Sequence, residues 1–144
     1  MSPIHALREN LKLRPAWMSG LLFFCAYMTF LYLPWDIFFK PVSEDQEVWF
    51  GYMFTGWAAK ASAIPHWLVY GAGTLGFWKM KSWMHPWASL YVLQIAISMF
   101  VWSFLNDDGQ DELVGALVAI PFIILTIALW RAKPGFSENL NPVS

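Results

Sequence analysis

The chain has 144 residues, of which 58% are hydrophobic and only 13% are charged, whereas soluble domains carry about 25% charged residues. This composition excludes an ordinary soluble domain and predicts a membrane protein, and the length allows one unit of about three to five spanning helices. The formal net charge of −1 provides no basic surface for nucleic acid, so we expect no nucleic-acid partner.

Residues 1–15 predict an amphipathic leader on the cytoplasmic side of the membrane. Ile4, Leu7 and Leu11 recur at helical spacing among basic residues, a pattern typical of a helix that lies along the membrane interface. No small-residue cleavage site follows the leader, so we expect the next apolar run to be retained as a membrane span.

Four segments are predicted to cross the bilayer. They cover about residues 16–36, 46–79, 83–105 and 112–131. Helix is the expected state, because each backbone polar group in lipid needs a partner within its own segment. The sequence therefore predicts an all-α, polytopic transmembrane domain over residues 16–133, with four transmembrane helices, followed by a flexible cytoplasmic tail over residues 134–144.

The charges are segregated between the two ends of the predicted bundle. Basic residues flank the cytoplasmic ends of the spans: Arg8, Lys12, Arg14, Lys79, Lys81, Arg131 and Lys133. Acids gather at the opposite ends: Asp36, Glu44, Asp45, Glu47, Asp107, Asp108, Asp111 and Glu112. The positive-inside rule then places both termini in the cytoplasm, and the short loops fit a multi-pass protein of a bacterial inner membrane.

The second span is expected to be unusually long. Ser43 and Gln46 form a capping-box pattern that starts a helix, and no strong breaker except Pro65 occurs before Lys79. A straight helix of that length measures about 55 Å, more than one crossing requires. We therefore expect a second helix over residues 46–79 that begins outside the hydrocarbon or bends near Pro65.

This layout gathers charged and aromatic residues at the outer end of the bundle. Asp36, Glu47 and Lys60 would surround an aromatic-lined space that includes Trp49 and Trp57. One interpretation is an interfacial helix with solvated acids. The other is a pocket in which an apolar molecule contacts the rings and its polar end meets a charged or polar group.

The third predicted span carries a polar stripe. Trp87, Tyr91, Gln94, Ser98 and Trp102 follow each other at spacings of 4, 3, 4 and 4 residues, which places them on one helical face. Such a stripe serves either hydrogen bonding between helices or the wall of a pocket. Both interpretations direct it toward the bundle interior.

Other motifs indicate packing rather than cofactor chemistry. The run GAGTLG lies inside a predicted span, so we interpret Gly71, Gly73 and Gly76 as a small-residue face for a neighbouring helix. His66 and His85 fall at opposite ends of the bundle, and the single cysteine, Cys25, has no disulfide partner in the chain. We expect no metal site and no cofactor.

Several short motifs together resemble the EXPERA domain of emopamil-binding sterol isomerases and the sigma-two receptor. They are PWD at 34–36, VWF at 48–50, Pro65, WKMKSW at 78–83, YxxQ at 91–94 and IPFIILTIALWRAKP at 120–134. The resemblance covers about residues 16–134. It implies four spans with both ends cytoplasmic, and a site for a sterol-like molecule near the aspartate that ends the first helix.

One position departs from the family pattern. The family has a functional glutamate about eight residues after the WF pair, where this chain has Trp57. Binding is therefore favoured over catalysis. We predict a protein of the lipid bilayer that binds a sterol- or isoprenoid-like ligand. Asp36 is the expected anchor, with Glu47, Lys60, His66 and Gln94 as further polar groups, and Trp49, Trp57 and Tyr91 as lining.

Two alternatives follow from the same residues. The chain could be a small accessory subunit that packs through its glycine face against a larger membrane complex, or against a second copy of itself. It could also be an isomerase, provided that Glu47 folds inward as the second acid of the bundle.

Overall fold

The computed structural model describes residues 2–105 and 111–136, and within them the chain is mostly helical. The helices are α1 (Pro3–Leu11), α2 (Ala16–Tyr27), α3 (Leu33–Phe38), α4 (Gly56–Lys79), α5 (Met84–Leu105) and α6 (Glu112–Arg131). A π-helical turn (Met28–Tyr32), two 3₁₀ turns (Val42–Glu44 and Lys133–Gly135) and the strands β1 (Gln46–Trp49) and β2 (Tyr52–Thr55) complete the fold. Asp107, Asp108 and the predicted tail from residue 137 lie outside the described residues.

Three helices in the described part of the chain are long and apolar enough to cross a membrane. They are the continuous helical segment Ala16–Phe38, α5 and α6. The prediction of a helical membrane protein is therefore confirmed. Helix α4 has 24 residues but is less apolar, and it is not among the three.

The first of these helices widens for one turn at residues 28–32. Leu33 N–H donates to the carbonyl of Met28, five residues earlier, where an α-helix would use the carbonyl four residues earlier. Pro34 explains the change, because it has no N–H and its ring crowds the carbonyl of Phe30. The helix thereby continues past the proline as far as Phe38.

The expected helix over residues 46–79 was wrong in its first ten residues, which form an antiparallel hairpin. Gln46 pairs with Thr55 and Trp49 with Tyr52. Phe50 and Gly51 both have positive φ, 50° and 87°, which is the geometry of a two-residue hairpin turn. Aromatic and β-branched residues on both sides of this turn favour strand, and they outweigh the capping-box pattern. Helix α4 then runs from Gly56 to Lys79 through Pro65.

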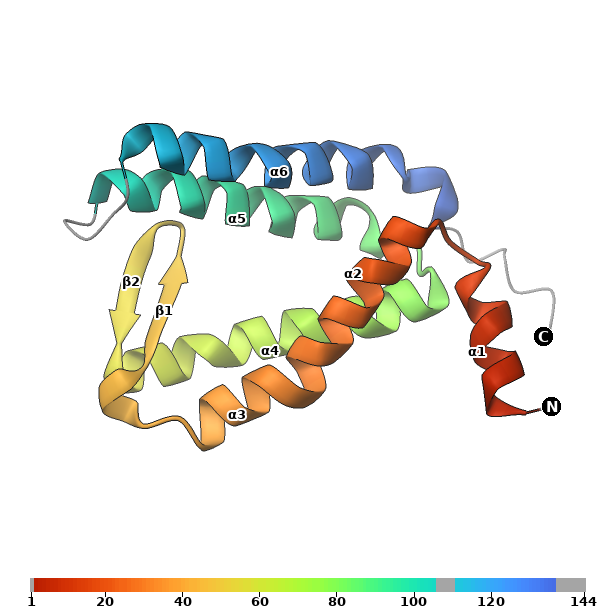
Figure 1. Cartoon of the computed structure of the whole chain (residues 1–144), viewed down its shortest axis with the longest axis horizontal. Coiled ribbons are helices and arrows are strands. Elements are labelled where there is room, and N and C mark those ends of the chain that lie inside the picture. The colour runs from red at the N-terminus through yellow and green to blue at the C-terminus, as the bar shows by residue number, and fades with distance from the viewer. Residues whose placement is uncertain (1, 106–110, 137–144) are drawn as a thin grey trace.

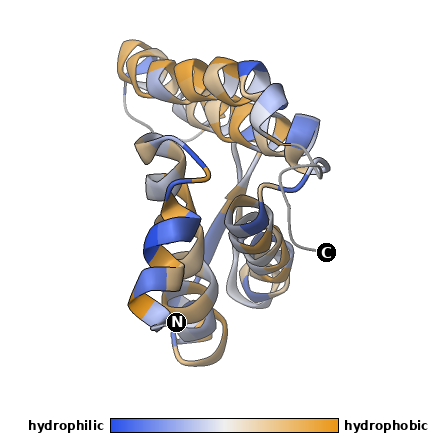
Figure 2. Ribbon diagram, turned by 90° about the vertical axis from the view of Figure 1, so that its right-hand side faces the viewer, coloured by the Kyte–Doolittle hydropathy of each residue, from blue (hydrophilic) through white to orange (hydrophobic). Residues whose placement is uncertain are grey.

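The helices form two layers (Figure 1). Helices α5 and α6 pack side by side along their whole length, and the segment from α2 to α3 packs against α4 in the second layer. The β1–β2 hairpin joins the layers at one end. At the other end, α1 and the α4–α5 turn lie near the last residues of α6. Hydrophobic residues cover α5 and α6, whereas hydrophilic residues gather on α1 (Figure 2).

The main hydrophobic core lies at the end opposite the hairpin. It consists of Met18, Leu22, Cys25, Phe77, Met80, Met84, Leu129 and Phe136. Arg14 closes this end, since its guanidinium donates to the carbonyl of Trp78 at 3.0 Å. The two layers are therefore joined by apolar packing at one end and by the hairpin at the other.

Substitution of Gly51 tests how the hairpin docks on α5. A Cβ at this position would lie 2.5 Å from Cγ1 of Val101, on a backbone with φ of +87°. We expect Gly51→Ala to lower the free energy of unfolding by about 2–4 kcal/mol, through both overpacking and backbone strain. Thermal unfolding of the detergent-purified protein measures the change.

Gly20→Ala is the matched control, because a Cβ at Gly20 meets nothing within 4 Å. It should leave stability unchanged or raise it by up to about 1 kcal/mol, as alanine is the better helix former. Equal effects of the two substitutions would contradict the docking of the hairpin on Val101.

Candidate functional site

A cavity of about 550 Å³ lies between the two helical layers. Side chains from α2, the hairpin, α4, α5 and α6 line it. No charged side chain occurs among the described residues of the lining, which are mainly leucine, valine, alanine and aromatic side chains. The volume falls within the range of about 300–1,000 Å³ that is typical of small-molecule sites.

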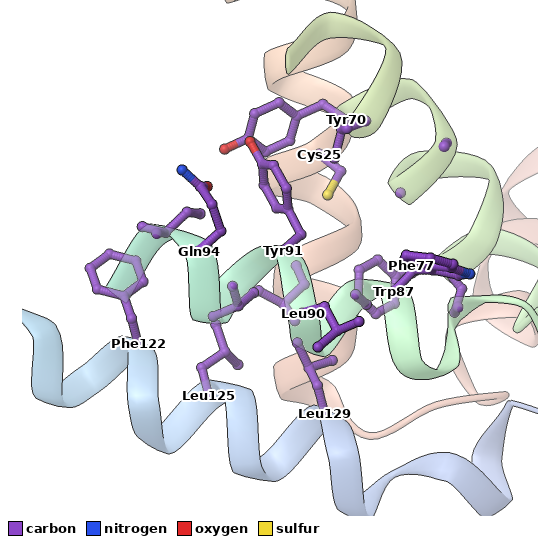
Figure 3. Close-up of a pocket in the computed structure, with 18 of the residues that line it drawn as sticks. Cys25, Tyr70, Phe77, Trp87, Leu90, Tyr91, Gln94, Phe122, Leu125 and Leu129 are labelled. Atoms are coloured by element: carbon purple, nitrogen blue, oxygen red, sulfur yellow. The ribbon is translucent and has the colours of Figure 1, made fainter. Parts of the chain in front are cut away.

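The polar groups of the lining gather toward one end of the cavity (Figure 3). Tyr70, Tyr91 and Gln94 lie together there, while Phe77 and Trp87 lie toward the other end. Tyr91 and Tyr70 pack edge to face, with ring centroids 5.8 Å apart. The cavity is therefore amphipathic along its length, with a small polar end and a large apolar body.

The residues of this polar end are tied to their neighbours. Gln94 Nε2 donates to Ser98 Oγ at 2.8 Å, and Gln94 Oε1 is buried without a partner in the described structure. The Tyr91 hydroxyl lies 2.6 Å from Nδ1 of His66. Tyr91, Gln94 and Ser98 of the polar stripe of α5 face the bundle interior as the sequence pattern predicts, whereas Trp87 of the same stripe is 66% exposed.

The hairpin covers the polar end of the cavity. Trp49 and Phe50 are part of the lining, and the Trp49 ring stacks on His66 with centroids 3.9 Å apart. Trp49 Nε1 also donates to the carbonyl of Ser62 at 3.1 Å. The hairpin is thus attached to α4 through its aromatic side chain and to α5 through Gly51.

Behind the hairpin, four buried or half-buried charges form a cluster that joins α3, the following loop and α4. The ammonium of Lys40 lies 3.0 Å from Asp36 Oδ1 and 3.1 Å from Asp45 Oδ1. Lys60 lies 3.1 Å from Asp45 Oδ2, and its ammonium donates to the backbone carbonyls of Asp36 and Lys40. We call Asp36, Lys40, Asp45 and Lys60 the charge cluster.

Pairing within the charge cluster keeps Lys40 and Asp45 ionised. Burial disfavours the ammonium of Lys40, but hydrogen bonds to Asp36 and Asp45 outweigh this effect and raise the pKa of Lys40. Burial likewise disfavours the carboxylate of Asp45, yet hydrogen bonds from Lys60 and Lys40 hold the pKa of Asp45 below its usual value. These ion pairs therefore persist across the physiological pH range.

Glu47 lies beside the charge cluster without a lysine partner. Its Oε2 is 3.6 Å from Nε2 of His66. Burial, with a further contribution from the negative charges of Asp36 and Asp45, raises the pKa of Glu47 to about 7. A row of contacts thus runs from Glu47 through His66 to Tyr91 at the cavity wall.

The structure separates the predicted site residues into two groups. Trp49, Tyr91 and Gln94 line the cavity. Asp36, Glu47, Lys60 and His66 are absent from the described lining and lie in or beside the charge cluster. Trp57 has 76% of its surface exposed and belongs to neither group.

The three glycines expected to form a packing face are used within the chain. A Cβ at Gly73 would lie 3.0 Å from Cys25 Sγ, and one at Gly76 would collide with the side chain of Met84. A Cβ at Gly71 would lie 3.7 Å from Cγ2 of Thr29. Because α2 and the α4–α5 turn cover this face, a partner helix would need another surface.

Sequence reasoning did not single out two members of the charge cluster, Lys40 and Asp45. Lys40 follows Asp36 by four residues, a spacing that favours an ion pair on a helix, so this signal was present. The turn after Pro41 brings Asp45 to both lysines, and no local sequence pattern predicts that contact.

No protein-family model, curated protein or solved structure matches this chain. The cavity and the charge cluster are accordingly interpreted from their own geometry.

Neighbouring acids test the role of the charge cluster in stability. Asp45 is fully buried between two ammoniums, whereas Glu44 is exposed. We expect Asp45→Asn to lower the free energy of unfolding by about 3–5 kcal/mol, because Lys60 then loses its carboxylate partner and Lys40 loses one of its two. Glu44→Gln should change it by less than about 0.5 kcal/mol. If the two variants unfolded at the same temperature, the charge cluster would not contribute to the stability of the fold.

Proposed function

We propose that this protein binds a neutral, hydrophobic small molecule of sterol or isoprenoid type in the cavity between its helical layers. The observation that carries the proposal is the cavity itself, with about 550 Å³ of volume and an almost wholly apolar lining. An apolar ligand gains free energy from leaving water for such a site, at about 25 cal/mol for each Å² that it buries.

The chemistry of the lining favours a neutral ligand. An ammonium or carboxylate in the cavity would lose its hydration, and the described lining offers no opposite charge. Uncompensated burial of a charge is strongly unfavourable. Fatty acids and amines are therefore poorer candidates than sterols, isoprenoid alcohols and related neutral lipids.

A single polar group on the ligand would lie at the end near the hairpin. Tyr91 lies there, beside the His66 ring on which Trp49 of the hairpin stacks. Gln94 lies near Tyr91 on α5 (Figure 3), and the described structure offers no donor to Gln94 Oε1. A hydroxyl group that reached this acceptor would satisfy it, which favours an elongated ligand with one hydroxylated end. We propose Gln94 and Tyr91 in place of Asp36 as the polar anchor, because Asp36 is engaged by Lys40.

The membrane arrangement that fits this function has four crossings. In this arrangement, α4 crosses the membrane in addition to the segment from α2 to α3, α5 and α6. Helix α4 runs beside α2 between the two ends of the bundle (Figure 1). The basic end would face the cytoplasm by the positive-inside rule, with the hairpin at the outer face. Residence in a bacterial inner membrane and kinship with the EXPERA domain are further parts of the proposal.

Native mass spectrometry of the purified protein tests ligand binding. We expect a stoichiometric neutral lipid to accompany the wild-type protein, and Ala72→Trp to remove it by filling the cavity that Ala72 lines. Organic extraction and mass analysis then identify the molecule.

Ala61→Trp is the matched control, because Ala61 is also exposed on α4 but does not belong to the described cavity lining. This variant should retain the bound lipid. A wild-type protein that carries only bulk phospholipid, or equal loss of lipid from both variants, would refute the proposal.

The contact between Glu47 and His66 supports a second candidate, a double-bond isomerase. Glu47 does fold inward, and the row through His66 reaches Tyr91 in the cavity wall. In such a reaction one proton is added to an alkene carbon and another is removed from a neighbouring carbon, so that the double bond moves without net oxidation.

Turnover of a sterol-like alkene distinguishes the isomerase from a binding protein. For an isomerase, Glu47→Gln should lower kcat by about 10²-fold or more while the alkene still binds. A wild-type protein that binds the alkene without converting it, or a fully active Glu47→Gln variant, would remove this candidate.

A further inference from the structure

The hairpin end of the molecule holds more acid than base. Three carboxyl groups lie there, those of Asp36, Asp45 and Glu47, against the two ammoniums of Lys40 and Lys60. Asp36 and Asp45 are 0% and 1% exposed. With the three carboxyl groups and two ammoniums ionised and His66 neutral, this region would carry one uncompensated negative charge away from water, which is strongly unfavourable. One additional proton removes the imbalance.

Glu47 is the carboxyl group best placed to hold that proton. In the described structure, both aspartates have a lysine within 3.1 Å, whereas the partner within ion-pair distance of Glu47 is the imidazole of His66, which carries a charge only when protonated. Besides burial, the negative charge of Asp36 helps to raise the pKa of Glu47, and Asp36 Oδ2 is buried without a hydrogen-bond partner in the described structure. Protonation of Glu47 therefore removes one negative charge beside an aspartate that is only partly compensated.

The same strand connects Glu47 to the cavity. Glu47 and Trp49 are two residues apart on β1, so their side chains point to the same face of the hairpin. Both reach His66, Glu47 through the 3.6 Å contact and Trp49 through its stacked ring. Trp49 is also part of the cavity lining. A change in how Glu47 is held is thereby transmitted to the cavity wall.

We propose that Glu47 is a proton-binding site that holds the β1–β2 hairpin closed over the cavity, and that loss of its proton releases the hairpin. The ionised carboxylate would be repelled by Asp36 and Asp45 and would move toward water, and Trp49 would leave His66 with it. The inference goes beyond ligand binding, because the hairpin opens and closes whether or not the cavity is occupied.

The direction of the pH effect follows from the pKa of Glu47, which is about 7 in the closed hairpin against a usual value of 4.5. The closed form binds the proton more tightly than an open form in which Glu47 is solvated. Its stabilisation is therefore complete below about pH 4.5 and is lost as the pH rises to about 7.

Two charged neighbours, Lys40 and Asp45, do not compete with Glu47 for a proton in this interval. The pKa of Asp45 is lowered and that of Lys40 is raised, so neither changes its charge there. Asp36, Asp45 and Lys40 act on Glu47 from α3 and the loop that follows it. His66 lies beside Glu47 on α4, and Tyr91 of α5 lies beyond His66. A variant at Glu47 that leaves His66 intact shows which of these two residues binds the proton.

Hydrogen–deuterium exchange of the full-length protein in nanodiscs tests the proposal without any ligand. Exchange is measured at about pH 5 and about pH 7.5 and corrected for the intrinsic pH dependence of amide exchange. In the wild-type protein, we expect protection of residues 46–55 to fall by at least about tenfold between the two conditions. Protection of α6 should not change.

Two variants complete the experiment. Glu47→Gln nearly keeps the shape of the side chain but cannot ionise, so protection of its hairpin should differ by less than about twofold between the two conditions. Glu44→Gln removes an exposed acid three residues earlier and should retain the wild-type response. If Glu47→Gln also lowered the protection of α6, wild type and Glu44→Gln would still test the proposal, because a pH-independent wild-type hairpin or a lost response in Glu44→Gln overturns it.

Three results would overturn the proposal. One is a wild-type hairpin whose protection is independent of pH. Another is a pH response that persists in Glu47→Gln, which would assign the proton to His66. The third is loss of the response in Glu44→Gln, which would indicate a general surface-charge effect. None of these results depends on whether the cavity binds a lipid.

Discussion

The position of Asp45 between Lys40 and Lys60 is the interaction on which the outer half of the molecule depends. Lys40 follows α3 and Lys60 lies on α4, so one buried carboxylate joins the two helices and fixes the loop between them. Lys60 also donates to the backbone carbonyls of Asp36 and Lys40, which lie where the helix ends and its carbonyls need partners from outside the helix. The hairpin begins at Gln46, directly after Asp45. The ion pairs of Asp45 therefore help to place the hairpin over the cavity.

The two ends of the bundle are stabilised by different physical forces. Apolar packing around Met80 and Leu129 holds the end near the termini, and ion pairs hold the other. Between them, the layers separate enough to leave a cavity. Apolar packing alone would tend to close such a space, whereas charges at one end and a β-hairpin of fixed length set the layers apart. The cavity is thus a product of the architecture as a whole.

Composition and periodicity predicted the parts of this structure that depend on local sequence. Helices near residues 16–36, 83–105 and 112–131 follow from apolar runs, and the inward face of Tyr91 and Gln94 follows from helical spacing. The hairpin was missed because Ser43 and Gln46 imitate a helix start, while the decisive signal was a two-residue turn with positive φ at Phe50 and Gly51. The pairing of Asp45 with two lysines is a tertiary contact, and no local pattern encodes it.

The single cysteine of the chain gives the cavity a chemical property of its own. Cys25 lies in the lining, buried against Gly73, and the sequence contains no other thiol. A hydrophobic thiol reagent that enters the cavity would meet this one sulfur atom, whereas a water-soluble thiol reagent would find no other cysteine in the chain. A buried thiol reacts slowly, because the thiolate is the reactive form. Alkylation of Cys25 would therefore favour a reagent that the cavity holds against the sulfur over one that only dissolves in the surrounding lipid.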